Sequence, residues 1–189
     1  MSERSGESDS RSPARGPIII ASFQGWNDAG DSASSTTLHL CDSFGGDEVV
    51  ELDPESYNDF QVYRPYVALR AGKRELQWRT TRIYRLTSAP GERDLYVVQG
   101  LEPSLRWKSF CTELLDFARS VNAAQIVCVA ALLADAAHTR PIPVLMTSED
   151  ADLRREFGVL SSNYQGPTGI VGVLSHFAHE AGMPLISCW

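Results

Sequence analysis

The first clear pattern of apolar and polar positions is a short apolar run, followed by a polar loop and then by a helical repeat. Residues 17–21 are apolar and mostly β-branched, as in a strand covered on both faces. Polar residues at 25–31 interrupt this run. Ala33, Thr37 and Leu40 then recur at helical spacing, so one face of a helix can pack back on the strand. The stretch therefore predicts a strand, a loop and a helix.

The same alternation continues along the chain. Short apolar runs predict buried strands at 48–52, 95–99, 124–133, 142–146 and 185–189. Helical periodicity predicts helices at 107–121, at 148–157 with Ser148 as the cap, and from Pro167 to Ala181. Short exposed strands are predicted at 66–69, 74–78 and 82–86, the first two joined as a hairpin. Strands that alternate with helices at this spacing predict an α/β fold, with a mostly parallel sheet and helices on both faces.

The composition fits a single folded domain. The chain has 189 residues, of which 43% are hydrophobic and 22% charged, as in an average globular protein. Residues 1–15 are polar and lack the apolar core of a secretory signal, so they predict a disordered tail before one domain at 16–189. A domain rarely ends on an unpaired apolar strand, so we also expect this domain to be truncated at its C-terminus.

Charge and hydropathy exclude two classes of partner. The formal net charge is -7, whereas a nucleic-acid-binding face is basic. No apolar run approaches the roughly 18 residues of a membrane span. The cysteines lie far apart in apolar patterns, at Cys41, Cys111, Cys128 and Cys188. Buried free thiols in a reducing cytoplasm are therefore expected, rather than disulfides or metal ligands.

Three polar loops follow predicted strands and define a candidate cleft. Ligands of parallel α/β sheets bind beyond the carboxyl ends of the strands, where the loops at Asn27, Glu102 and His138 would meet. The first loop matches neither the Walker nor the dinucleotide pattern. Asp28 and Asp31 would each repel a phosphate within about 4 Å by roughly 4 kcal/mol, whereas the helix dipole returns only about 0.3–1 kcal/mol. We therefore expect Asn27 or Asp28 to cap the following helix, and no anion site.

His138 and Arg140 follow a buried strand and can point into the same cleft. A histidine with an unperturbed pKa near 6.5 could act as a general acid or base, with Asp135 or Glu102 as its partner. The alternative is structural, with His138 and Arg140 hydrogen-bonding loop carbonyls so that the next strand can start. The residue types alone leave both interpretations open.

No metal site, cofactor or nucleophile is predicted. His176 and His179 lie three residues apart on the last predicted helix, but the sequence offers no third ligand beside them. The serines at 161–162 do not form a nucleophile elbow, because the G-x-S-x-G pattern is absent.

Five motifs together resemble one family. They are, in chain order, GWNDAGDSAS at 25–34, DPESYNDFQVYRP at 53–65, GLEPSLRWKSF at 100–110, LLADAAHTRPIPV at 132–144 and SNYQGPTGIVGVL at 162–174. In this order they resemble the proteasome assembly chaperone 2 family, most closely its actinobacterial branch. The resemblance implies a three-layer α/β/α sandwich of the phosphorylase/hydrolase-like kind. It also implies ATP-independent scaffolding of proteasome assembly, the role of eukaryotic and archaeal members, whereas the activity of the bacterial branch is undefined.

Some positions depart from the family pattern. Ala130 or Ala131 stands where the family usually has a Gly, and Ala137 where it has a Pro directly before its His. Members also continue past the last strand with a Pro-His-Tyr segment and further helices. The hydrophobic residue and Tyr with which the chaperones dock on the proteasome are absent from residues 187–189.

Two functions from different classes follow. The first is a non-catalytic protein-binding or assembly scaffold, which would bind a protein partner or a second copy of itself through Tyr57, Phe60, Tyr63 and Tyr66. The alternative is a nucleoside-like small-molecule site, or a hydrolase or phosphorylase, at Asp28, Glu102, His138 and Arg140. The missing nucleophile pattern favours the scaffold.

Overall fold

The computed structural model describes residues 16–88, 91, 93–137 and 139–189. The predicted tail at 1–15 lies outside these residues. The strands are β1 (Ile18–Gln24), β2 (Gly46–Glu51), β3 (Tyr66–Arg70), β4 (Lys73–Gln77), β5 (Arg82–Leu86), β6 (Leu95–Leu101), β7 (Gln125–Val129), β8 (Met146–Thr147) and β9 (Leu185–Cys188). The helices are a 3-10 turn (Ala29–Asp31), α1 (Ser32–Phe44), α2 (Pro54–Tyr57), α3 (Trp107–Ser120), α4 (Ala151–Phe157) and α5 (Ile170–Glu180).

Within the described residues, seven strands form one mixed sheet in the order β2-β5-β6-β1-β7-β9-β8. The four central strands, β6, β1, β7 and β9, run parallel. The outer strands β5 and β2 on one side and β8 on the other pair antiparallel to their neighbours. β9 is paired on both sides, so the expectation of an unpaired last strand is wrong. The predicted α/β fold is confirmed, but the sheet is mixed rather than mostly parallel: the pairings of the central strands are parallel and those of the outer strands antiparallel.

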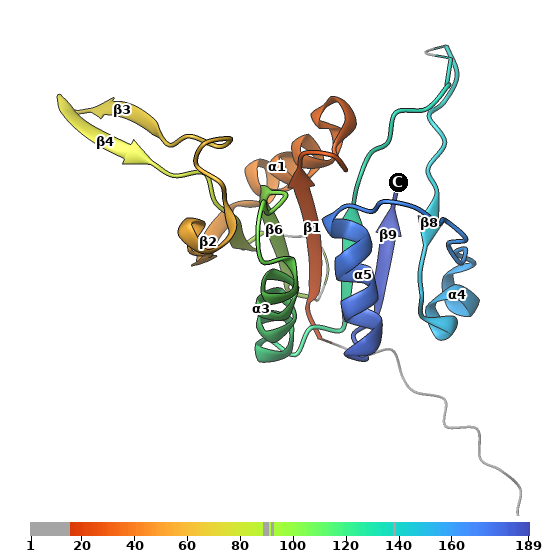
Figure 1. Ribbon diagram of the computed structural model, residues 1–189. Helices are drawn as coiled ribbons and strands as arrows, with labels where there is room; N and C mark the ends of the chain where they lie inside the picture. The colour runs from red at the N-terminus through yellow and green to blue at the C-terminus, as the bar shows by residue number, and fades with distance from the viewer. Residues whose placement is uncertain (1–15, 89–90, 92, 138) are drawn as a thin grey trace, which may run out of the picture.

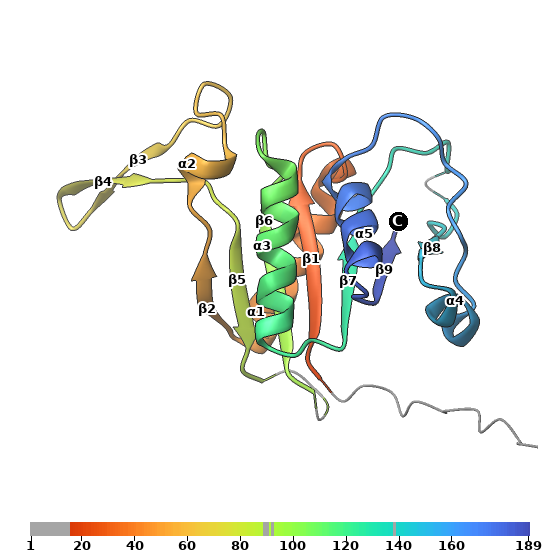
Figure 2. The same cartoon turned by 60° about the horizontal axis from the view of Figure 1, so that its bottom comes forward.

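Helices cover both faces of this sheet (Figures 1 and 2). α1 packs on β1 and β6, where the Ser22 hydroxyl of β1 lies 2.6 Å from the Thr37 hydroxyl of α1. α3 and α5 pack together on the opposite face. Side chains alternate along a strand, so Ser22 points to α1, whereas Ile19 and Phe23 point to α3 and α5. The three layers implied by the family resemblance are therefore present.

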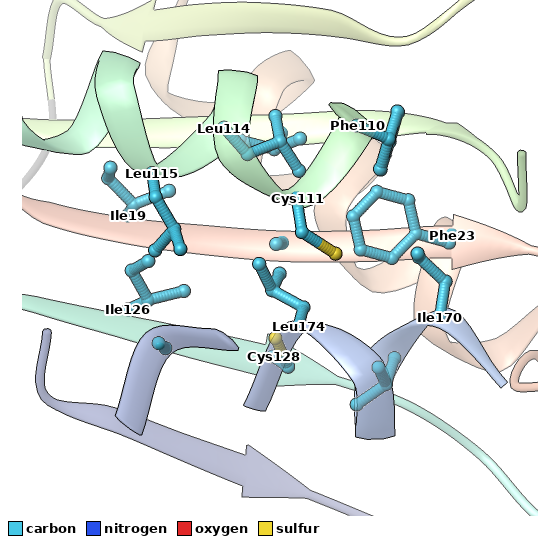
Figure 3. Close-up of a cluster of buried hydrophobic side chains, with 14 of the residues drawn as sticks. Ile19, Phe23, Phe110, Cys111, Leu114, Leu115, Ile126, Cys128, Ile170 and Leu174 are labelled. Atoms are coloured by element: carbon cyan, nitrogen blue, oxygen red, sulfur yellow. The ribbon is translucent and has the colours of Figure 1, made fainter. Parts of the chain in front are cut away.

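The main core lies between the sheet and the helices α3 and α5 (Figure 3). The predicted apolar stripe of α3 supplies Phe110, Cys111 and Leu114, which are buried against β1. Ile170 and Leu174 of α5 close the other side of the cluster. This packing fixes the carboxyl end of β1 and the first turn of α5 relative to each other.

The segment 130–145 departs from the predicted strands. β7 ends at Val129, and the run predicted at 142–146 contributes only Met146 and Thr147 to the sheet. The physical reason is the lack of a neighbouring strand: backbone partners on Ser187–Trp189 reach only Leu145 to Thr147. The apolar side chains before them stay in solvent, Leu133 with 93% of its surface exposed.

Two predicted helix starts are wrong. α4 is capped by Asp150, whose Oδ1 accepts hydrogen bonds from the backbone N–H groups of Asp152 and Leu153. Ser148 is instead buried, and its hydroxyl donates to the Leu185 carbonyl at 2.6 Å. Pro167 precedes α5, which begins at Ile170. For α4 the tertiary bond of Ser148 occupies its hydroxyl, and the local cap is made by Asp150 instead.

The four cysteines are free, as predicted, but only Cys111 and Cys128 are buried, whereas Cys41 and Cys188 are half-buried. Burial raises the pKa of the Cys111 thiol to about 12, and the same cause raises that of Cys128 to about 12. At neutral pH both thiols therefore stay protonated and behave as small apolar side chains. Among the described residues, no helix is both long and apolar enough to span a membrane.

Replacing Phe110 by Ala should destabilise the fold by about 3–5 kcal/mol, because it empties the centre of the main core. Phe110 is 1% exposed and packs edge-on against Phe23 and Tyr57, with ring centroids 5.6 Å and 5.2 Å apart. Urea denaturation would measure the loss. Leu133→Ala, at an exposed apolar position, is the control and should change the free energy of unfolding by less than about 0.5 kcal/mol. Equal losses in the two variants would contradict this assignment of the core.

Candidate functional site

The loops after β1, β6 and β7 meet at the carboxyl edge of the sheet through backbone hydrogen bonds. The N–H of Ala131 donates to the Asn27 carbonyl at 2.8 Å, and the N–H of Ala29 donates to the Ala131 carbonyl at 3.1 Å. On the other side of β1, the N–H of Glu102 donates to the Gln24 carbonyl at 2.8 Å. Parallel pairing places these strand ends together, as the sequence pattern suggested.

Asp28 caps α1 from a distance of five residues. Its Oδ1 accepts hydrogen bonds from the N–H groups of Ala33 at 2.7 Å and Ser34 at 3.2 Å. The intervening 3-10 turn makes this possible, because Gly30 and Asp31 adopt left-handed conformations that fold the chain back on itself. The Asp31 side chain is exposed and makes no cap hydrogen bond.

Glu102 holds the start of α5. Its Oε1 accepts a hydrogen bond from the N–H of Ile170 at 2.8 Å, where a carboxylate also interacts favourably with the helix dipole. Gly169 makes this approach possible. A Cβ there would lie 2.1 Å from Asn27 Oδ1 and 2.8 Å from Glu102 Oε1. Asn27, Glu102 and the first turn of α5 therefore form one close-packed cluster beside Asp28.

Two buried oxygens in this cluster have no hydrogen-bond partner among the described residues. They are Asn27 Oδ1 and Asp28 Oδ2, on side chains that are each 6% exposed. A buried acceptor without a donor costs about 1–3 kcal/mol. Both atoms can accept a hydrogen bond from an N–H or O–H group, whether of water or of a ligand. The cluster therefore holds two acceptors that no donor of the described residues satisfies.

The structure brings together three of the six residues predicted for the cleft. Asn27, Asp28 and Glu102 lie in the cluster, whereas Asp31 is exposed on the outer side of the turn. Arg140 is exposed on the segment 130–145. His138 lies outside the described residues. Within the part of the chain that the structure describes, no group of His, Cys, Asp or Glu side chains is arranged to hold a metal ion.

One residue of the predicted protein-contact surface is buried. Tyr57 is 7% exposed, packs on Phe110, and donates a hydrogen bond from its hydroxyl to Glu113. Burial and the bond to Glu113 raise the pKa of Tyr57 to about 12. The prediction that Tyr57 contacts a partner is therefore wrong, because the ring belongs to the core.

The other aromatic residues of that surface lie nearer to solvent. Phe60 packs against Trp78 with ring centroids 4.7 Å apart, and the guanidinium of Arg79 lies over the Tyr63 ring. Tyr66 is exposed at the start of β3. The strands of the hairpin were predicted to be exposed, but their apolar residues Val67, Leu69 and Leu76 were not included in the predicted contact surface. The sequence pattern that indicates these residues is the alternation of apolar and charged residues in two short strands that pair only with each other.

A groove of about 860 Å³ separates the β3–β4 hairpin from the body. The body side includes Leu38 of α1, Glu48 and Glu51 of β2, and Arg82 of β5. The hairpin side includes Tyr66, Arg70, Glu75 and Leu76. The groove thus combines charged and apolar walls, and it lies on the β2 side of the sheet.

Comparisons with known proteins agree on one family. The PAC2 family model matches residues 22–189. A PAC2 family protein from Streptomyces avermitilis is 46% identical, with a TM-score of 0.88 over 92% of this chain and 74% of that one. The Mycobacterium tuberculosis proteasome-assembly chaperone homologue Rv2125 is 41% identical, with a TM-score of 0.82 over 91% of this chain and 73% of that one. PbaA of Pyrococcus furiosus, an archaeal homologue of the proteasome-assembly chaperone, shares the fold at 17% identity. Its TM-score is 0.63, over 94% of this chain and 72% of that one. No curated protein sequence matches significantly.

Asp28→Ala should lower the free energy of unfolding by about 0.5–2 kcal/mol, because it removes the cap of α1. Asp31→Ala is the matched control. It removes the same charge three residues away, on a side chain without a cap hydrogen bond, and should stay within about 0.5 kcal/mol of the wild type. Thermal or urea denaturation would separate the two variants. An equal loss in both would show that the carboxylate charge matters and the cap does not.

Proposed function

The chain belongs to the PAC2 family, and we propose that it acts as a non-catalytic protein-binding scaffold of the assembly-chaperone kind. The observation that carries this proposal is the 41% identity to the Mycobacterium tuberculosis proteasome-assembly chaperone homologue, over 91% of this chain. Its partners in this proposal are proteasome subunits or their assembly intermediates. A cytoplasmic location, expected from the free thiols, belongs to the same proposal.

The distribution of exposed apolar side chains supports a protein-binding role. Large apolar residues are exposed on the β3–β4 hairpin and in the residues 132–137 and 139–145. Leu69 on the first is 74% exposed, and Ile142 on the second is 83% exposed. Contiguous exposed apolar surface on a folded protein marks interaction sites.

A second candidate is a nucleoside-like small molecule bound at the strand ends. The buried acceptors Asn27 Oδ1 and Asp28 Oδ2 are the specific observation that favours it, because the hydroxyl and amino groups of nucleosides are hydrogen-bond donors. Glu102 beside them is held by α5 and could orient such a ligand. His138 and Arg140 remain proposed as contributors from the neighbouring loop.

The scaffold proposal predicts that the chain accelerates proteasome assembly without ATP. Purified α and β subunits of the same organism would be mixed with and without the chain, and native gels would follow intermediates and complete particles. A Leu133→Asp, Ile142→Asp double variant should lose the effect, because it places charge on the exposed segment. Lys108→Glu on the exposed side of α3 is the control. Unchanged assembly kinetics with an excess of folded chain would contradict the proposal.

The small-molecule proposal predicts stabilisation by a nucleoside. A ligand at a hundredfold excess over its Kd raises the free energy of unfolding by about 2.7 kcal/mol, which a thermal-shift measurement detects. The rise should disappear in Asn27→Leu, which keeps the branched shape of the side chain but removes the free acceptor, and should persist in the exposed variant Asp31→Ala. A flat response across nucleosides and bases would rule this candidate out.

A further inference from the structure

The β3–β4 hairpin has free strand edges. β3 and β4 pair only with each other, and no backbone hydrogen bond joins β4 to any other element of the described chain. In Figures 1 and 2 the hairpin extends away from the sheet on the side of β2. An isolated two-stranded hairpin is at best marginally stable in water, and the unpaired N–H and C=O groups of an edge strand are a template for a further strand. The hairpin can therefore accept a third strand from another molecule.

The groove of about 860 Å³ between the hairpin and the body runs along the edge of β4. Its hairpin side includes the consecutive residues Glu75, Leu76 and Gln77. Successive side chains of a strand point to opposite faces, so a groove lined by three of them in a row borders the edge of the strand. An added strand on this edge of β4 would lie in the groove.

Arg79, which follows β4 at the base of the hairpin, is a groove cation without an ion pair. Arg70 lies 3.7 Å from Glu75, and Arg82 pairs with two carboxylates of β2, each at 3.2 Å. No carboxylate of the described residues lies within ion-pairing distance of the Arg79 guanidinium. Arg79 is therefore available to an anion from outside the chain.

Its neighbours hold Arg79 in one orientation. A guanidinium N–H donates to Gln24 Oε1 at 2.8 Å, and the guanidinium lies over the Tyr63 ring, 5.6 Å from its centroid. The Arg79 carbonyl accepts a hydrogen bond from Asn58 Nδ2 at 2.7 Å. The side chain is half-buried, and its other N–H groups have no acceptor among the described residues. A guanidinium held in this way is preorganised to donate two parallel bonds to a carboxylate.

The charges of the groove favour a single carboxylate over a phosphate. The lining carries three arginines and three glutamates, so its formal charges balance. A carboxylate on Arg79 adds one negative charge. A phosphate monoester would add about two beside the same three glutamates, which repel it.

Exposed apolar side chains line the same groove. They are Leu38 of α1, Tyr66 of β3, Leu76 of β4 and Trp78, whose ring packs on Phe60 with centroids 4.7 Å apart. Exposed apolar surface of this kind marks a binding site. The groove therefore suits an occupant that carries apolar side chains beside its carboxylate.

We propose that the groove binds an extended segment of a partner protein, which adds to the edge of β4 as a third strand and places a carboxylate side chain on Arg79. Its apolar side chains cover Leu38, Leu76 and Trp78. Main-chain bonds to β4 give such a contact its affinity, and Arg79 selects an acidic residue in the segment. The proposal rests on the protein-binding function proposed above, and it assigns to that function a surface and a chemistry of the partner.

Fluorescence anisotropy with synthetic peptides tests the carboxylate contact. The probes are labelled seven-residue peptides of alternating valine and threonine, uncharged at both ends, with a glutamate at each threonine position in turn. In a matched set, glutamine replaces the glutamate. We expect the best glutamate probe to bind about tenfold more tightly than its glutamine counterpart, and Arg79→Gln to abolish this preference. Arg119→Gln, on the exposed side of α3 over the opposite face of the sheet, is the matched control and should keep it.

Methylation of the probe's backbone nitrogens tests the added strand. The N–H groups of successive residues point to opposite edges of a strand, so only one alternate set of them can reach β4. We expect methylation of one set to abolish binding and methylation of the other set to leave it. Leu38→Ser should weaken the glutamate and glutamine probes by the same factor, whereas Leu133→Ser should weaken neither.

Three results would overturn the inference. They are probes that do not bind, glutamate and glutamine probes that bind the wild type equally, and equal binding after methylation of either set. A folded Arg79→Gln variant, checked by circular dichroism, that still prefers glutamate would also contradict it. A chain that accelerates proteasome assembly but ignores the probes contradicts this inference alone, whereas probe binding without any effect on assembly contradicts only the assembly role.

Discussion

The burial of β1 on both faces is the constraint on which the other features of this protein depend. α1 closes one face through the Ser22 and Thr37 hydroxyls, and α3 with α5 closes the other over Ile19 and Phe23. A one-residue shift of its register would turn Ser22 toward α3 and α5, and Ile19 and Phe23 toward α1. Its carboxyl end is therefore fixed, and with it the turn that carries Asn27 and Asp28. The packing of this core therefore holds the residues of the strand-end cluster in place.

Sequence periodicity was sufficient for the elements whose pattern is local. α3 was recognised from its apolar stripe, and the hairpin from two short strands around a turn, because in both the pattern is local. The prediction of a strand at 142–146 was wrong because strand pairing there is not a local property. Strand formation there depends on a neighbour far away in the chain, and only Met146 and Thr147 have one. Apolar composition alone could not reveal that the side chains before Met146 stay exposed.

The candidate site was predictable only in part. The rule that polar loops gather at parallel strand ends brought Asn27 and Glu102 together correctly, since it depends on topology. The burial of Tyr57 could not be read from its aromatic neighbourhood, because Phe110 reaches it from a helix far along the chain. The role of Gly169 could not be predicted either. Asn27 and Glu102, which are distant in sequence, occupy the space that a side chain at Gly169 would need.

The hydrogen bond between Glu102 and Ile170 has a consequence for the order in which the chain can fold. It joins residues 68 positions apart, across the whole of α3, β7, β8 and α4. Closing so long a loop costs chain entropy that local contacts do not repay, so such contacts form slowly. The hairpin, by contrast, pairs residues close in sequence and needs nothing from the C-terminal part of the chain. In a growing or refolding chain the β3–β4 hairpin can therefore pair before the strand-end cluster is assembled.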